Sequence, residues 1–254
     1  MIRSWIGVSL YELYANLKPQ GIMALLIIDP FIYLLLFVPA MRGVIGNVGY
    51  GPRSVDYASF VLPGILTMSL LSTSISLCTP LYTARESGEI EVLLSSPVSW
   101  WMLLIAKMEV MVIRILVEGL VILGVGSVLV SSFTLPVSNL ILSLLIATLF
   151  GVGFGLFFLS ISSIIINAQI YHLSINLLFL PLLFSSPIFY PSEGMPIWLR
   201  VVAKFNPLTF AVEAIRASFF GIGLREYTTS LTGGLVVSSQ KVGRDQVAAR
   251  DLRD

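Results

Sequence analysis

Five long apolar runs alternate with short polar breaks along the chain. The apolar runs cover residues 23–41, 57–81, 102–131, 139–166 and 172–188. A helix crosses the hydrocarbon core of a bilayer with about 20 apolar residues at about 1.5 Å each. The pattern therefore predicts an all-α, polytopic membrane protein with five clear transmembrane helices, all within residues 21–222.

The C-terminal part does not supply a sixth crossing of ordinary length. Tyr227–Ser239 is mildly apolar and only 13 residues long, below the minimum of about 17. We therefore expect the sixth span to be truncated or missing, and residues 223–254 to form an atypical tail.

The N-terminal segment, residues 1–20, is too polar to span. It mixes Trp5 and Tyr14 with Glu12 and Lys18. Aromatic and charged residues in one short helix are typical of an amphipathic helix that lies in the membrane interface. By contrast, the four glycines between Arg42 and Asp56 predict a flexible loop.

A second helix that is too short to span is predicted at residues 207–220. Asn206 is placed to cap its first turn, Pro207 suits the first helical position, and Gly221 suits the stop. An apolar helix of this length is typical of a re-entrant or interfacial segment.

The densest charge between two apolar runs lies at residues 85–91. Thr83 and Glu86 have the capping-box spacing, in which each side chain bonds a free backbone N–H of the first turn. Pro97 disfavours helical geometry at the residue before it. The pattern predicts a short one-sided helix at 84–96, which serves either as a docking surface or as a solvated turn.

Charges also occur inside the third apolar run. Arg114 and Glu118 are one helical turn apart and can pair, which lowers the cost of keeping either in the membrane. We interpret them as an intramembrane ion pair buried between helices; the alternative is a proton or substrate relay with Asp29 and Glu109.

A GxxxG spacing lies in the fourth run, at Gly151 and Gly155. Such a spacing lets two helix backbones approach closely. It predicts a packing seam, either within the chain or between two subunits.

Composition narrows the class of protein to which the chain can belong. The 254 residues are 56% hydrophobic and 11% charged, against about 25% charged for a soluble domain, and the mean hydropathy is +0.93. A net charge of +1 gives no argument for nucleic-acid binding. A single cysteine and a single histidine rule out a Cys/His metal cage within one chain, and no nucleophile with a nearby base stands out, so we do not expect an enzyme.

Two motifs give the chain a family resemblance. Residues 85–99, which read RESGEIEVLLSSPVS, closely resemble the cytoplasmic coupling segment of type-2 ABC transporter (ABC-2) membrane subunits. Residues 186–191, 196–198 and 206–216 are similar to the outer-face signature of the same family. The resemblance implies an ATPase-coupling set of Arg85, Glu86, Gly88, Glu89, Glu91, Leu94 and Pro97. It also implies an outer-face motif of Pro191, Pro196, Trp198, Asn206, Pro207, Glu213 and Arg216.

The resemblance implies a permease subunit of an exporter, similar to drug and polysaccharide exporter permeases. Its substrate would be amphipathic, lipid-like, drug-like or a glycan, and its partners a P-loop ABC ATPase subunit, a second permease copy or homologue, and membrane lipid. The chain has no G-x-x-x-x-G-K-[ST] phosphate loop, so ATP and Mg²⁺ would bind to the separate ATPase and no cofactor to this chain. We expect a multi-pass protein of the cell membrane with a cytoplasmic N-terminus. Alternatives are an ion-coupled secondary transporter and a truncated, non-functional or regulatory permease.

Overall fold

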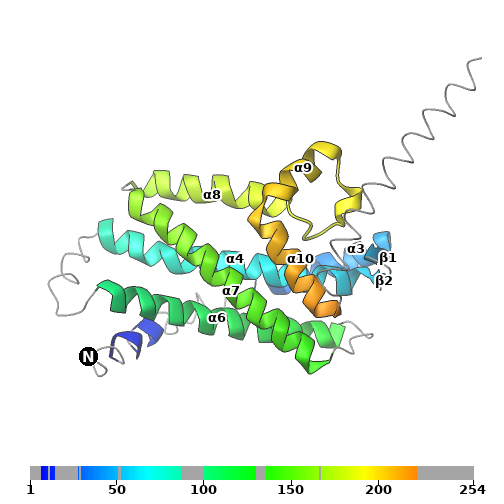
Figure 1. The fold of residues 1–254 in the computed structure, drawn as a ribbon, viewed down its shortest axis with the longest axis horizontal. Coiled ribbons are helices and arrows are strands. Elements are labelled where there is room, and N and C mark those ends of the chain that lie inside the picture. Colours follow the sequence, from blue (N-terminus) through cyan, green and yellow to red (C-terminus); the bar gives the residue numbers. More distant parts are fainter. Residues whose placement is uncertain are drawn as a thin grey trace, which may run out of the picture.

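The computed structural model describes residues 7–10, 12–14, 28, 30–50, 53–86, 100–129, 136–165 and 167–221. Its body consists of three long helices that contact one another, α4 (Tyr57–Glu86), α6 (Trp100–Leu129) and α7 (Val137–Ile164). Helices α4 and α6 follow the long axis, and α7 crosses them obliquely (Figure 1). Helix α4 contacts both of the others, and every residue from Phe60 to Leu71 is buried. The core of the bundle therefore lies around the first half of α4.

The structure is mostly helical, as expected. Within the described residues, three helical segments are long and apolar enough to cross a membrane, namely Tyr57–Ser76, Leu104–Ser127 and Val137–Ile164. Two shorter apolar helices, Pro30–Ile45 and Gln169–Phe184, fall on the first and fifth apolar runs. The total of five crossings stays a prediction, and Asp29 and residues 222–254 lie outside the described part.

The fifth apolar run forms α8 (Ala168–Phe184), which is shifted towards the N-terminus from the predicted 172–188. The side chain of Asn167 accepts hydrogen bonds from the backbone N–H groups of Gln169 and Ile170, so the helix begins there. Residues 168–171, which lie between the predicted fourth and fifth runs, therefore belong to the helix. The helix ends at Phe184, before the turn that leads into Pro187.

Helix α4 also corrects the predicted start of the coupling helix. It continues unbroken through Thr83 to Glu86, so these two residues do not form a capping box at a new N-terminus. Propagating an existing helix adds one hydrogen bond per residue, whereas a new helix requires a costly nucleus. The remainder of the coupling segment, including Gly88, Glu89, Glu91, Leu94 and Pro97, lies outside the described residues.

The predicted flexible loop after the first run is instead a β-hairpin. The chain passes through the π-helical turn η1 (Tyr33–Phe37) and α3 (Val38–Ile45), and turns at Gly46 with φ of 67°. Strands β1 (Asn47–Tyr50) and β2 (Arg53–Asp56) then pair antiparallel, with Tyr50 opposite Arg53. Val48 and Tyr50 alternate towards the buried side, a pattern that the glycine content concealed.

Between α8 and residue 221, where the described part ends, the chain forms three short helical elements. They are the 3₁₀ turn η2 (Ser192–Gly194), α9 (Ile197–Phe205) and α10 (Pro207–Phe220). The predicted limits of α10 are confirmed, because Asn206 is its N-cap, Pro207 its first residue, and Gly221 its left-handed C-cap with φ of 64°. Helix α9 was not predicted.

The GxxxG seam lies within the chain. A Cβ atom added at Gly151 would be 2.2 Å from the Ile115 side chain of α6, and one at Gly155 would be 2.5 Å from Met111. Gly153, between them, has open space. The two glycines therefore let α7 pack closely against α6.

Candidate functional site

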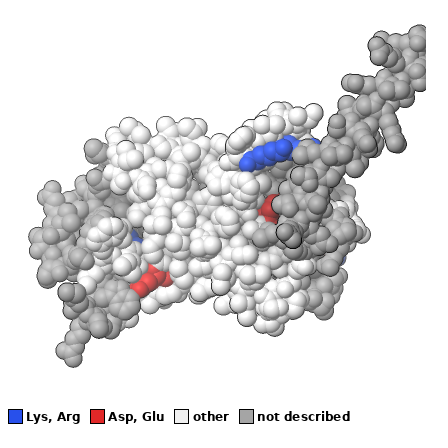
Figure 2. All heavy atoms as spheres, viewed as in Figure 1, with Lys and Arg blue, Asp and Glu red and all other residues white. Residues whose placement is uncertain are grey.

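The candidate residues gather at opposite ends of the bundle. The coupling end, as we call it, comprises residues 7–10 and 12–14, the last turn of α4 and the first turns of α6 (Figure 1). The hairpin end comprises β1, β2, residues 185–196, α9 and α10. Figure 2 shows the described charged atoms on this side lying toward the two ends, with an uncharged middle. This distribution suits a protein whose middle lies in hydrocarbon.

At the coupling end, the N-terminal helical residues are held against α6 by two polar contacts. Lys107 Nζ lies 3.1 Å from Glu12 Oε1, and both side chains are largely buried. Ser9 Oγ donates to Glu109 Oε2 at 2.8 Å. Arg85 and Glu86 end α4 at the same end of the bundle.

At the hairpin end, Arg216 of α10 is completely buried and satisfied by several partners. Its Nε donates to the Phe60 carbonyl at 3.2 Å, and its Nη1 donates to Glu213 Oε1 at 3.1 Å. Its Nη2 donates to the carbonyls of Pro187 at 2.8 Å and Ile188 at 3.4 Å. One guanidinium therefore joins α10, α4 and the segment after α8.

The hairpin enters the same network through Tyr50. Its hydroxyl donates to Glu213 Oε2 at 3.3 Å, and its ring lies 5.8 Å from the Arg216 guanidinium. Burial raises the pKa of Tyr50 well above its ordinary value, and the nearby Glu213 carboxylate raises that pKa further. Tyr50 is therefore a neutral donor throughout the physiological pH range.

Asn206 connects the last turn of α8 to the first turn of α10. Its Oδ1 accepts from the Leu208 backbone N–H at 2.8 Å, and its Nδ2 donates to the Leu182 carbonyl at 2.7 Å and to Ser185 Oγ at 2.8 Å. A single cap thereby positions α10, including Glu213 and Arg216, relative to the membrane helices.

The outer-face motif separates into two groups in the structure. Asn206, Glu213 and Arg216 are buried and hydrogen-bonded, whereas Trp198 is exposed. Pro191 and Pro196 directly precede η2 and α9, where their extended backbone sets the start of each helix.

In the middle of the bundle, Arg114 and Glu118 of α6 are both buried. Glu118 Oε2 accepts hydrogen bonds from Ser69 at 2.9 Å and Thr73 at 2.6 Å, both on α4. Within the described part of the chain, no hydrogen bond or ion pair joins Arg114 to Glu118. The carboxylate therefore connects α6 to α4 through hydroxyl groups, and the Arg114 charge attracts it through space without the direct contact expected from the spacing.

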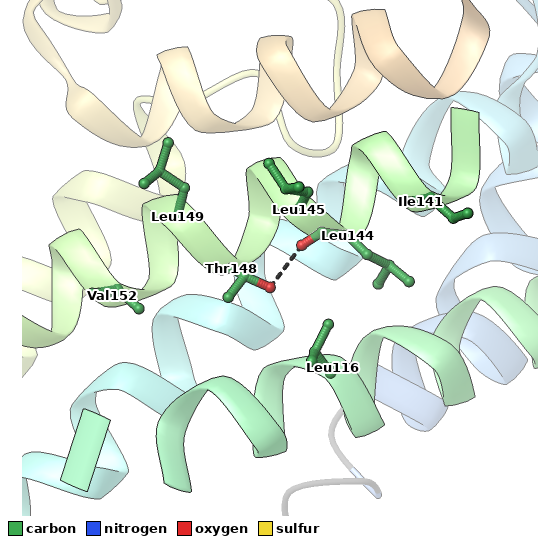
Figure 3. Close-up of a pocket in the computed structure, with 7 residues that line it drawn as sticks. All are labelled: Leu116, Ile141, Leu144, Leu145, Thr148, Leu149 and Val152. Atoms are coloured by element: carbon green, nitrogen blue, oxygen red, sulfur yellow. Dashed lines mark hydrogen bonds between the residues drawn. The ribbon is translucent and has the colours of Figure 1, made fainter. Parts of the chain in front are cut away.

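An open groove of about 510 Å³ lies between α6 and α7 (Figure 3). Its lining is apolar apart from Thr148, whose hydroxyl is already bonded to the Leu144 carbonyl at 2.7 Å. A ligand in this groove would be held by the shape of the groove and by apolar contacts. The lining has no group for acid–base chemistry. The described residues also contain no cluster of His, Cys, Asp and Glu that could hold a metal ion.

Sequence reasoning missed several participants in these contacts. Tyr50 and Phe60 carry no local signal, because their partners are more than 150 positions away in the chain. Ser69 and Thr73 are two of many hydroxyl residues in the second apolar run, and their spacing does not mark Glu118 as their partner. For α9, the apolar residues at positions 197, 201 and 205 with cations at 200 and 204 were a readable amphipathic pattern.

Long apolar helices, a surface without charge around the middle of the bundle on the side shown in Figure 2, and polar networks at both ends are typical of a polytopic helical membrane protein. The ABC-2 type transporter family profile matches residues 16–220, most of the chain. The chain belongs to the ABC-2 type transporter family and is a transport permease of that family.

Individual relatives agree with this assignment. The chain is 28% identical to the putative transport permease ycf38 of Cyanophora paradoxa, over 81% of this chain and 70% of that protein. It is 28% identical to the probable multidrug ABC transporter permease YbhR of Escherichia coli, over 63% of this chain and 43% of that protein. It is 22% identical to the daunorubicin resistance ABC transporter permease protein DrrB1 of Streptomyces coeruleorubidus, over 78% of this chain and 71% of that protein.

Proposed function

We propose that this chain is the membrane subunit of an exporter that is driven by a separate ATPase subunit. The observation that carries the proposal is the continuity of α4. This helix has 30 residues, so it extends about 45 Å between the two ends of the bundle. It carries Arg85 and Glu86 at the coupling end and Tyr57 and Phe60 at the hairpin end.

Helix α4 would transmit force because it is attached firmly at the hairpin end. The Tyr57 hydroxyl donates to the Phe189 carbonyl at 3.0 Å, and the Phe60 carbonyl accepts from Arg216. The backbone of Gly64 lies so close to Ile188 that an added Cβ would be 2.5 Å from its carbonyl oxygen. A tilt of α4 would therefore move residues 187–189 and α10 together.

In the proposed cycle, ATP-driven closure of two ATPase subunits pushes on the coupling segment, residues 85–96. Two permease copies or homologues respond by tilting α4, and this opens a path between them that is lined by the first, second and fifth apolar runs. The coupling end, with the N-terminal helical residues, would face the cytosol of the cell.

The proposed substrate is an amphipathic, lipid-like or drug-like molecule or a glycan. Exposed surfaces of the described spans are apolar, with large side chains such as Leu36, Leu173 and Leu177 pointing outward. Two relatives have names that refer to multidrug transport and daunorubicin resistance. Both observations favour a substrate with substantial apolar area over a small ion.

The test is co-purification of the full chain from membranes with its ATPase, followed by ATPase and export assays in proteoliposomes. The double variant Glu86→Ala/Glu91→Ala should reduce substrate-stimulated ATP hydrolysis and export together. Arg42→Ala, which removes one exposed charge next to the hairpin, is the control and should retain both. Unchanged export in the double variant would refute the coupling role, and export driven by an ion gradient without ATP would favour a secondary transporter.

A further inference from the structure

Helix α9 is amphipathic, and its apolar side faces away from the protein. Ile197 and Phe205 are 81% and 84% exposed, and the exposed large apolar residues of the helix are Ile197, Trp198, Val201, Val202 and Phe205. At about 100° per residue, they occupy an arc of about 140°. Ala203, on the opposite side, is buried against the protein. An apolar face of this breadth requires a partner other than water.

The cations of α9 lie along one border of this apolar face. Arg200 and Lys204 occupy the helical positions next to Ile197, and Figure 2 shows basic atoms over this part of the molecule. Arg200 Nη2 donates to the Met195 carbonyl at 3.2 Å, so its side chain is held against the protein. Lys204 is exposed at the border between the apolar face and the solvent.

Hydrogen bonds hold the segment that contains α9 at the level of the last turn of α8. After α9, Asn206 donates to the Leu182 carbonyl at 2.7 Å. Before α9, the Tyr190 hydroxyl donates to the Phe184 carbonyl. The exposed apolar surface of α8 ends at Phe184, and Figure 1 shows α9 beside this end. The apolar face of α9 thus lies level with the last apolar turn of α8.

We propose that α9 binds the lipid surface at the hairpin end of the bundle. Its apolar face enters the boundary of the acyl chains, and Lys204 contacts the phosphate groups of anionic lipids. Trp198 suits this depth because its ring is apolar and its N–H is polar. An apolar stripe with a basic border matches a headgroup layer in both its chemistry and its arrangement. The inference depends on the chain being a membrane protein and does not depend on the ATPase.

The first experiment measures the surroundings of α9 with a spin label on the full chain in phospholipid vesicles. Cys78→Ser removes the native thiol, and Val201→Cys places the label on the apolar face. Leu120→Cys on the exposed side of α6, which is not part of the proposed path, is the lipid reference, and Gly194→Cys, where an added Cβ meets nothing within 4 Å, is the aqueous reference.

The label at position 201 should resemble that at 120, with high access to oxygen and low access to a water-soluble nickel chelate. Nickel access equal to that at position 194 would overturn the proposal, because the face would then be in water. Low access to both reagents, with dipolar broadening between labels, would also overturn it and assign the face to a second copy of the chain.

The second experiment tests the charge. A fluorophore attached to the thiol of the Val201→Cys variant is quenched either by brominated phosphatidylglycerol or by brominated phosphatidylcholine in mixed vesicles. One cation near an anionic surface should enrich phosphatidylglycerol over phosphatidylcholine near the fluorophore about fivefold. Lys204→Gln should lower this enrichment ratio towards one. A ratio that Lys204→Gln leaves unchanged, or one near unity in the parent protein, would overturn the phosphate contact.

Discussion

The Arg216 guanidinium lies 3.9 Å from the centre of the Phe60 ring, so the cation of α10 rests on an aromatic face of α4. This contact joins residues 156 positions apart. A cation that is desolvated over an aromatic ring gains about 2 kcal/mol from the ring quadrupole. The pair therefore fixes α10 to the helix that runs to the coupling end.

Replacing Arg216 by leucine should strongly destabilise the protein. The change leaves the Glu213 carboxylate and the Pro187 carbonyl buried without this donor, and breaking one side of a buried pair costs about 3–5 kcal/mol. The measurement is thermal unfolding in mild detergent. Lys204→Leu removes an exposed cation and should stay within about 0.5 kcal/mol of the parent; equal stability of the two variants would contradict the network.

Tyr50→Phe should change how stability depends on pH. The pKa of Tyr50 is raised in the folded protein, so its stabilising effect is complete below the unfolded pKa of about 10 and is lost as pH rises above that value. The parent should therefore be more stable than Tyr50→Phe at neutral pH, and the difference should shrink above about pH 10. A difference that stays constant across this range would argue against a buried neutral hydroxyl.

Gly64→Ala should destabilise the hairpin end. The new Cβ would lie 2.5 Å from the Ile188 carbonyl oxygen, which is backbone and cannot rotate away. Overpacking of this kind costs about 1–3 kcal/mol. The matched variant is Gly124→Ala on α6, where an added Cβ meets nothing within 4 Å. There, the higher helix propensity of alanine should be neutral or stabilising by up to about 1 kcal/mol.

Thr73→Val should weaken the packing of α4 against α6. It keeps the side-chain shape but removes the 2.6 Å hydrogen bond to Glu118, and a bond to a charged group contributes about 1.5–3 kcal/mol. Ser76→Ala is the control, because the Ser76 hydroxyl bonds back to the Ser72 carbonyl of its own helix. Detergent unfolding curves that coincide for the two variants would show that Glu118 does not depend on Thr73.

Charge reversal should reveal the link between the N-terminal helical residues and α6. Glu12→Lys and Lys107→Glu should each destabilise the protein, and the double variant should recover part of the loss. A double-mutant cycle should give a coupling of about 0.5–3 kcal/mol. The exposed Arg42–Asp56 pair at 3.0 Å is the comparison and should show only about 0–1 kcal/mol. Coupling no larger than in that pair would contradict the buried contact.

Local signals in the sequence are sufficient for the existence of the long apolar helices and for the limits of α10. Apolar runs of span length predict membrane helices because the cost of leaving backbone groups unpaired in hydrocarbon acts within each segment. The limits of α10 were predictable for the same reason, since Asn206, Pro207 and Gly221 act on neighbouring backbone groups. The family also followed from contiguous motifs at residues 85–99 and 186–216.

Tertiary structure alone decided the contacts between those helices. The alternating Val48 and Tyr50 became a hairpin because α10 and α4 bury one side of it, which outweighs the glycine content. Glu118 bonds to α4 hydroxyls because that helix lies opposite it, although spacing on its own helix favoured Arg114. The partners of Arg216, and the outward direction of the apolar face of α9, depend on packing between distant segments. A pattern along the chain specifies which side chains are apolar, while only the fold determines what each of them meets.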